Sequence, residues 1–379
     1  MATPFQAALA SRSWRGVEAL TRLRAARNLA GSSGPLLDLE PYLRRCLSVR
    51  PNYGSHKGST ALRMGIASAC GVEPDDILVT PGATLALALI AMATLEPGSQ
   101  ALLATPCYSP ARHSLLHTGA DVIEYRLRFE EGYRLDPKRF HSAISAKTKL
   151  VSLASPHNPS GTILSPDVLR QTSERLCANG AVLLVDESFR EAVYSPEQLT
   201  VSSAALSKNV VAVGSLSKAY GVPGLRIGWI ATQDRKRLQI LTRLKAEFVH
   251  SCSVLDEALA AEILNDRAAL LDRHGVALVR AMKLVAEWAD ANSALIEWIR
   301  PAAGAIACIR LRADRFGTVA LSEVQARLAA TDIALAPGSA FGEEDRVFRI
   351  GLASRSLEPA LRDLACILAN CASNECRPQ

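Results

Sequence analysis

The sequence predicts an α/β protein in which a large domain carries a mostly parallel sheet sandwiched by helices, next to a small α+β domain. Short apolar runs alternate with helical periods from about residue 75 onward, the pattern of a parallel sheet with crossover helices. Several of these runs are continuously apolar, as in strands covered on both faces. After about residue 270 the pattern changes, and 379 residues exceed what one hydrophobic core usually serves, so a second domain is expected.

The order of the expected elements follows from these runs. Strands of the large sheet are expected at 77–80, 101–104, 122–125, 150–154, 181–186, 210–214 and 227–231. Helices are expected between them at 84–95, 109–118, 166–179 and 234–249. In the small domain we expect helices near 275–291, 321–330 and 357–370, and strands near 306–311 and 347–351. The resulting division is an N-terminal segment that joins the small domain (1–45), a large domain (46–268) and a small C-terminal domain (269–379).

The composition argues against several classes of protein. With 49% hydrophobic and 21% charged residues, the chain is not wholly disordered. The longest apolar stretch, residues 85–95, is too short to cross a bilayer and is expected to be a buried helix, so no membrane partner is predicted. A net charge of +6 without a long basic run, and only 5% aromatic residues, argue against nucleic-acid binding.

The cysteines and the first residues bear on cellular location. No signal peptide opens the chain, so secretion is not expected. Nine cysteines without a CxxC pair favour a reducing compartment, here the cytoplasm, over a disulfide framework. Five arginines among the first 30 residues are compatible with a transit peptide, although an N-terminal helix packed on the body of the protein is favoured. No metal site is expected, because neither the cluster of Cys366, Cys371 and Cys376 nor the pair His113 and His117 has a complete ligand set.

Polar turns follow three of the expected strands, at the positions where ligands collect in such sheets. The turn 81–84 (PGAT) leads into a helix whose first N–H groups can bind an anion. The turn 155–161 (SPHNPSG) places Asn158 between two prolines that fix the local backbone. The run 181–186 ends on Asp186, a carboxylate that is costly to bury unless it meets a cation or a hydrogen-bond donor.

The strongest signal lies in residues 215–229 (SLSKAYGVPGLRIGW). Lys218 is placed in a loop among small residues, where desolvation helps an amine to lose its proton, as a Schiff-base lysine must. Ser215 and Arg226 flank it, and a hydroxyl and a guanidinium are suited to phosphate. The glycines do not match GxGxxG, which argues against a nicotinamide dehydrogenase.

Together these groups meet the needs of pyridoxal 5′-phosphate (PLP). Its aldehyde needs an amine, and its ring nitrogen needs a carboxylate that holds the ring proton. Its phosphate needs N–H groups, a hydroxyl and a guanidinium. The sequence therefore predicts PLP as the cofactor.

The blocks SPHNPSG, VDESF and SLSKAYGVPGLRIGW resemble those of the class I/II aminotransferases, PLP-dependent transferases of fold type I in the aspartate aminotransferase superfamily. Their order and spacing agree from about Tyr53 to Arg349. The resemblance implies that Lys218 forms the internal aldimine and that Asp186 pairs with the pyridinium nitrogen. It further implies cofactor contacts from Asn158 at the phenolic oxygen, from Tyr108 on the ring, and from Ala83, Thr84, Ser215 and Arg226 at the phosphate. For Tyr108, a plain core tyrosine is the alternative.

The same resemblance implies the substrate contacts. Arg349, inside an apolar strand, binds the substrate α-carboxylate, with a structural salt bridge as the alternative. Asn158 and Gly34 are further substrate-binding residues, the latter in a loop where family members often contact substrate. Tyr53 is similar to the tyrosine that reaches the neighbouring subunit's phosphate, which implies a homodimer with shared active sites.

One residue departs from the family pattern. Family members usually have tyrosine three residues after the aspartate, where its hydroxyl also bonds the phenolic oxygen of the cofactor, whereas this sequence has Phe189. Phenylalanine at that place resembles PLP enzymes that do not transaminate, including decarboxylases and the capreomycidine-synthase and arginine-oxidase types.

The sequence thus predicts an aminotransferase of amino-acid metabolism that moves the amino group of an L-α-amino acid to a 2-oxo acid through Lys218. The alternative is a PLP enzyme that performs elimination, cyclisation, decarboxylation or oxidation of an amino acid such as arginine in specialised-metabolite biosynthesis. A PLP-sensing regulator is disfavoured because the short N-terminal stretch leaves no room for a helix-turn-helix segment. No residue in the sequence identifies the accepted side chain.

Overall fold

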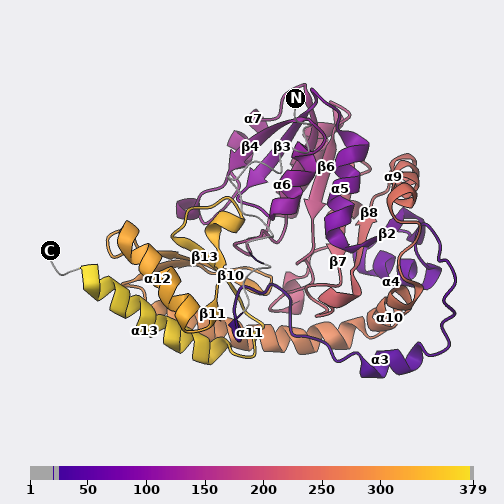
Figure 1. Ribbon diagram of the computed structural model, residues 1–379. Coiled ribbons are helices and arrows are strands. Elements are labelled where there is room, and N and C mark those ends of the chain that lie inside the picture. Colours follow the sequence, from indigo (N-terminus) through magenta and orange to yellow (C-terminus); the bar gives the residue numbers. More distant parts are fainter. Residues whose placement is uncertain (1–19, 21–24, 376–379) are drawn as a thin grey trace.

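The computed structural model describes residue 20 and residues 25–375, and it confirms the expected α/β class (Figure 1). The central sheet has seven strands in the order β2-β8-β7-β6-β5-β3-β4. All of them run parallel except β8, which is antiparallel to both β2 and β7. The strands are β2 (Ile77–Pro81), β3 (Gln100–Thr105), β4 (Asp121–Arg126), β5 (Thr148–Ala154), β6 (Val182–Asp186), β7 (Val210–Ser215) and β8 (Ile227–Ala231).

Helices cover both faces of this sheet, so the middle of each inner strand is mostly apolar. β7 and β8 are buried at every position, whereas the edge strand β4 is mostly exposed and carries Asp121, Glu124 and Arg126. Charged side chains on an edge strand oppose pairing with another chain. The continuously apolar runs in the sequence therefore correspond to strands that are buried on both faces of the sheet.

The helices of this part of the chain include four that the sequence predicts and four that it does not. The predicted ones are α5 (Gly82–Thr94), α6 (Ser109–Leu116), α8 (Pro166–Cys177) and α9 (Arg235–Phe248). The others are α3 (Glu40–Arg45), α4 (Thr60–Cys70), α7 (Pro137–Ser142) and α10 (Val254–Asn265). Short 3-10 helices lie at Pro74–Asp76, Phe129–Glu131, Pro196–Gln198, Ser203–Ala205, Pro223–Leu225 and Gly338–Ala340.

A second, smaller assembly follows the long helix α11 (Arg267–Ala291), which begins eight residues before the expected position. Its antiparallel sheet has the order β12-β13-β10-β9 and is accompanied by two helices (Figure 1). The elements are β9 (Ile296–Ile299), β10 (Ile306–Leu311), β12 (Ala336–Pro337), β13 (Val347–Gly351), α12 (Thr318–Ala330) and α13 (Leu357–Glu375). A two-residue strand β1 (Arg27–Asn28) pairs in parallel with β11 (Ile333–Ala334), which ties the beginning of the described chain to this assembly. The domain boundaries at residues 45 and 268 stay predictions.

Two further expectations concern regions that the structure covers only in part. The expected N-terminal helix and most of the Arg-rich stretch lie outside the described residues, as does Cys376. Within the described part of the chain, no helix is long and apolar enough to span a membrane, and no three histidine, cysteine or acidic side chains form a metal-binding group.

Candidate active site

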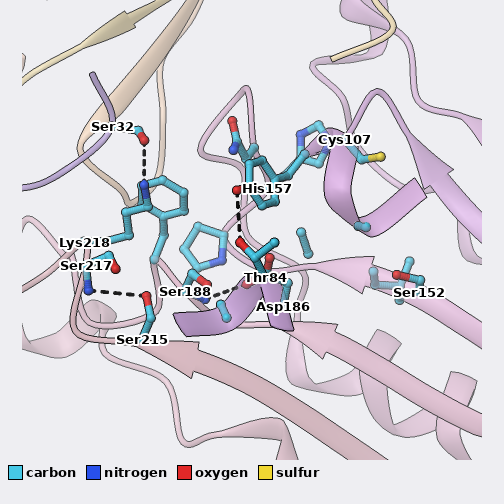
Figure 2. A pocket seen from close by; sticks show the side chains of 18 of the residues that line it. Ser32, Thr84, Cys107, Ser152, His157, Asp186, Ser188, Ser215, Ser217 and Lys218 are labelled. Atoms are coloured by element: carbon cyan, nitrogen blue, oxygen red, sulfur yellow. Dashed lines mark hydrogen bonds between the residues drawn. The ribbon is translucent and has the colours of Figure 1, made fainter. Parts of the chain in front are cut away.

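A cavity of about 150 Å³ lies at the carboxyl ends of β3, β5, β6 and β7 (Figure 2). Parallel strands end at one edge of a sheet, and the loops that follow them bring polar side chains together there. Strand β13 of the small assembly contributes Arg349, and the loop before α3 contributes Ser32. The lining includes the predicted residues Ala83, Thr84, Tyr108, Asn158, Asp186, Phe189, Ser215, Lys218, Arg226 and Arg349.

Lys218 lies three residues beyond the end of β7, and its amine points into the cavity (Figure 2). Nζ donates a hydrogen bond to Ser32 Oγ at 2.6 Å and lies 5.4 Å from the centre of the Phe189 ring. The loss of solvent around this amine, together with the positive charge of Arg349, lowers the pKa of Lys218 to about 8, although Asp186 acts in the opposite direction. About a tenth of the amine is therefore unprotonated at pH 7, far more than for an ordinary lysine.

Asp186 ends β6, and its carboxylate lines the same cavity. Oδ1 accepts a hydrogen bond from the backbone N–H of Ser188 at 2.9 Å. Burial raises the pKa of Asp186, while the hydrogen bond from Ser188 and the charge of Lys218 partly offset this rise. A carboxylate in this setting is stabilised by a protonated nitrogen that binds in the cavity.

The turn from β2 into α5 forms an anion seat with Arg226. Gly82 has a φ of +79°, and a Cβ at this position would overlap the guanidinium of Arg226, so only glycine allows this close approach. The free N–H groups at the start of the 13-residue helix α5 include those of Ala83 and Thr84. The hydroxyl of Ser215 lines the cavity as well, and Thr84 Oγ1 shares a hydrogen bond of 3.2 Å with the hydroxyl of Tyr108.

Arg349 is a buried cation on β13, with only 2% of its surface exposed. Nη1 donates to Asn158 Oδ1 at 3.0 Å and Nη2 to the carbonyl of Ala30 at 2.7 Å, while Nε is buried without a partner. Burial lowers the pKa of Arg349 to about 10. No acidic side chain of the described residues pairs with it, so the structural salt bridge considered from the sequence is not seen and an anion from outside the chain is expected.

Two residues predicted for the site lie elsewhere in this chain. Tyr53 is 88% exposed, and its ring contacts that of His250, with 4.9 Å between the centroids. Gly34 is not among the residues that line the cavity; it packs against the lysine loop, where its N–H donates to the carbonyl oxygen of Lys218 and a Cβ would lie 2.7 Å from that oxygen. Substrate binding by Gly34 stays a prediction, and Ser32 is the residue of the same loop that faces the cavity.

Sequence reasoning missed several residues of the lining, including Ser32, Ser152, Pro156, His157, Ser188 and Ser217. His157 is fully enclosed: Nε2 donates to the carbonyl of Pro106 and Nδ1 accepts from Ser160, and burial lowers the pKa of His157 to about 4. It is neutral at physiological pH and holds the Asn158 loop against the turn after β3. The histidine next to Asn158 in the SPHNPSG block was the available signal for His157, whereas for Ser32 the family resemblance indicated only the loop 32–34 as a whole.

The donor set fits a ligand with an aldehyde, a basic ring nitrogen and a phosphate. The aldehyde would find the amine of Lys218, the nitrogen would find Asp186, and the phosphate would find Arg226 with the N–H groups of α5. At the anion seat, the backbone of Gly82 lies so close to the guanidinium of Arg226 that a Cβ would overlap it.

Residues 47–362 match the sequence model of the family described as aminotransferase class I and II. Among curated proteins, the capreomycidine synthase of Streptomyces vinaceus is 32% identical over 300 residues, which cover 79% of this chain and 75% of that protein.

Solved structures agree with this match. A PLP-dependent aminotransferase from Streptococcus suis superposes with a TM-score of 0.85 at 25% identity, over 96% of this chain and 98% of that chain. A PLP-dependent cyclase, OrfR, superposes with a TM-score of 0.81 at 25% identity, over 91% and 93% of the two chains. One of these two solved enzymes is described as an aminotransferase and the other as a cyclase.

Proposed function

The chain belongs to the aminotransferase class I and II family and takes PLP as its cofactor, and from this premise we propose that it moves the amino group of an L-α-amino acid to a 2-oxo acid. The observation that carries this proposal is the arrangement of Lys218 and Arg349 in one cavity. An amine with a lowered pKa lies there with a buried guanidinium that has no counter-ion among the residues that the structure describes. The first group can move a proton, and the second can bind a carboxylate.

The proposal assigns roles to the residues that would hold the cofactor. Asp186 would bind the ring nitrogen, Asn158 the phenolic oxygen, and the seat formed by Arg226, Ser215 and the start of α5 the phosphate. When bound, PLP supplies an aldehyde that condenses with amines and a ring that accepts the electron pair left behind when the Cα proton departs.

The remaining steps belong to side chains of this chain. Arg349 binds the substrate α-carboxylate through the guanidinium edge that includes the unpartnered Nε, and Asn158 fixes the orientation of that guanidinium through Nη1. Lys218, once its amine is free, removes the Cα proton as a general base and later returns a proton as a general acid. Its pKa of about 8 suits both roles near neutral pH.

We also propose that two copies of the chain share their active sites. The exposed ring of Tyr53 lies outside its own cavity, and the apolar side chains of Leu47 and Phe248 are exposed as well, at 84% and 60%. A homodimer that covers these side chains would bring Tyr53 to the partner's phosphate seat.

The cysteines of the described residues are all free, which supports a reducing compartment such as the cytoplasm.

A second candidate is a PLP enzyme that eliminates or cyclises instead of transaminating. Three observations favour it. The relative in Streptomyces vinaceus is a synthase, and one structural neighbour is a cyclase. In addition, Phe189 offers no hydroxyl next to Lys218. A phenyl ring at this position cannot donate a hydrogen bond to the cofactor, so the electronic setting of the ring differs from that in a site with tyrosine there.

A single-turnover assay separates the two candidates. The holoenzyme is mixed with each common amino acid, and with arginine derivatives, in the absence of any 2-oxo acid, and the products are quantified. Transamination releases one equivalent of 2-oxo acid per subunit and then stops until an acceptor 2-oxo acid is added. Lys218→Ala, which lacks the proton-transferring amine, is the control and should give no product.

The outcomes have distinct meanings. One equivalent of 2-oxo acid followed by acceptor-dependent turnover supports the aminotransferase. Many turnovers without an acceptor, with release of ammonia, water or carbon dioxide, support the second candidate. If none of the amino acids gives a 2-oxo acid, the aminotransferase proposal is wrong.

A further inference from the structure

Residues 29–37 form a strap that connects the small assembly to the lysine loop. At one end, the backbone of Leu29 pairs with Ala334 and Gly351 through hydrogen bonds of 2.8 and 2.6 Å. At the other end, Gly34 donates to the carbonyl of Lys218 at 2.8 Å. Because both ends are fixed by backbone hydrogen bonds, the position of Ser32 between them is fixed as well.

Ser32 is the residue of this strap that reaches the reacting amine. Its Oγ accepts from Lys218 Nζ at 2.6 Å across 186 residues of sequence (Figure 2). Among the described residues, Asp186 acts on this amine only through its charge, with no ion pair formed, and Phe189 offers only the face of its ring. The hydroxyl of Ser32 is therefore the group that gives the free amine a defined direction.

We propose that Ser32 is a positioning residue, which holds the amine of Lys218 at the site of proton transfer whenever that amine is not attached to the cofactor. This inference rests on the proposed function, in which Lys218 is released by the substrate amine. A released lysine carries a flexible four-carbon stem, and binding one of its N–H groups restricts that freedom. An unprotonated amine that donates one N–H to Ser32 keeps its lone pair free for the Cα proton.

The hydrogen bond also affects the protonation of the amine. A hydroxyl that accepts from an ammonium stabilises the charged form more than the neutral form, so Ser32 opposes the lowering of the Lys218 pKa by burial. Removal of this hydroxyl is expected to move the titration of the amine to lower pH by about half to one pH unit.

The first test measures the amine itself, in the full-length chain from which the cofactor has been removed. Lys218 is labelled with trace acetic anhydride across pH 6.5–10, and the labelled fraction is determined by mass spectrometry of the digested protein. Lys283, whose side chain is 77% exposed, is the internal reference in every sample. Ser32→Ala is compared with Ser33→Ala, the matched control one residue along the strap, which does not line the cavity.

The second test measures proton transfer in the holoenzyme. For a turned-over amino acid, kcat of Ser32→Ala is expected to fall about ten- to a hundredfold with little change in KM, because the amine is misplaced while Arg349 still binds the substrate. The isotope effect of an α-deuterated substrate on kcat is expected to increase, since proton transfer becomes slower relative to the other steps. The pair Ser32→Thr and Ser32→Val has nearly the same shape and differs in the hydroxyl, so Thr should rescue both readouts and Val should not.

The labelling test does not depend on which reaction the holoenzyme performs, so it still decides the role of Ser32 if the proposed transamination fails. An unchanged titration of Lys218 in both Ser32→Ala and Ser32→Val would overturn the proposal. A higher KM without a change in the titration would also overturn it and would assign Ser32 to substrate binding. If Ser32→Ala does not fold, the comparison of Thr with Val gives the answer alone.

Discussion

Arg349 shows how a single buried charge can indicate a binding site for an anionic ligand. A guanidinium inside an apolar strand is costly unless an anion or several acceptors compensate it. Here Asn158 and the carbonyl of Ala30 supply two acceptors, and Nε has none. The apolar neighbours of Arg349 in the sequence indicated that it needs an anion, and the family resemblance implied that this anion is the substrate α-carboxylate, but the missing counter-ion among the described residues became visible only in the structure.

Arg349→Gln should therefore raise KM for the amino acid about ten- to hundredfold, because one charge-assisted contact to the carboxylate is lost. Steady-state kinetics with the best amino acid give this value. The control is the corresponding amine without a carboxylate, whose slow reaction should be unaffected by the substitution. Equal losses for both compounds would place the carboxylate somewhere other than Arg349.

Lys218 carries the pH dependence expected of the site. Its pKa is lowered to about 8 from an ordinary value of 10.5, mainly by loss of solvent. Because only the neutral amine attacks an aldehyde, capture of PLP by the cofactor-free protein should accelerate as pH rises from 7 to 9 and then level off. Stopped-flow absorbance from pH 6.5 to 10 measures this rate.

The reference compound for this titration is Nα-acetyl-lysine, whose reaction with PLP should still accelerate above pH 9. Lys218→Ala should show no capture. A capture rate that does not level off by pH 9.5 would contradict the lowered pKa.

The same lowered pKa makes protonated Lys218 a destabilising group in the folded, cofactor-free chain. This penalty is full below pH 8 and is relieved as pH rises toward 10.5, so the free energy of unfolding should increase over that interval relative to Lys218→Met.

At the scale of elements, the long apolar strands could be predicted from the sequence, whereas the two-residue strands and the helices α3, α4, α7 and α10 were not predicted. Strands β5 to β8 appear as apolar blocks because helices cover both faces of the sheet. The two-residue strands β1 and β11 contain too few residues for any periodicity. The helix expected near 275–291 begins at Arg267 instead and passes through Gly275, where a Cβ would meet only an ordinary contact with the carbonyl of Val193.

The strap offers a test at this scale, because its two glycines differ in their surroundings. Gly34→Ala should destabilise the protein by about 1–3 kcal/mol, since the new Cβ would lie 2.7 Å from the backbone oxygen of Lys218. Gly31→Ala is the matched control, because nothing lies within 4 Å of the Cβ position there. Thermal or urea unfolding of both variants gives the comparison; similar stabilities for the two would contradict the close approach of the strap to the lysine loop.

For the whole molecule, the fold class and the cofactor site could be predicted much further than the surroundings of the site. The SPHNPSG block forms one loop, and the SLSKAYGVPGLRIGW block runs from the end of β7 into the adjacent strand β8, so the spacing within each block already encodes local geometry. Ser32 reaches Lys218 through hydrogen bonds that its strap makes with β11 and β13, and no local pattern records contacts of that length. Gly34 was chosen from the loop 32–34 through the family resemblance, which does not distinguish between the residues of that loop.

The shared active site is the prediction that belongs to the complete assembly. Light scattering should give twice the mass of one chain, and Tyr53→Phe should leave that mass unchanged. The variant should hold PLP about tenfold more weakly or worse, since a hydrogen bond to a phosphate is lost. Cofactor loss during dialysis measures this; retention equal to that of the unaltered protein would exclude Tyr53 from the phosphate seat, and a monomer would exclude the dimer.

The strap also sets an order of events during synthesis of the chain. Ala30 leaves the ribosome early, but its partner Arg349 follows 319 residues later. The seven-stranded sheet ends at β8 and can assemble while translation continues, since domains generally form as units. The amine-holding serine therefore lacks the anchors of its strap on β11 and β13 until the last strands have been made, although the lysine loop that binds Gly34 is made earlier. A nascent chain stalled before β13 would thus contain Lys218 and Ser32 but lack both Arg349 and the strand that holds Leu29.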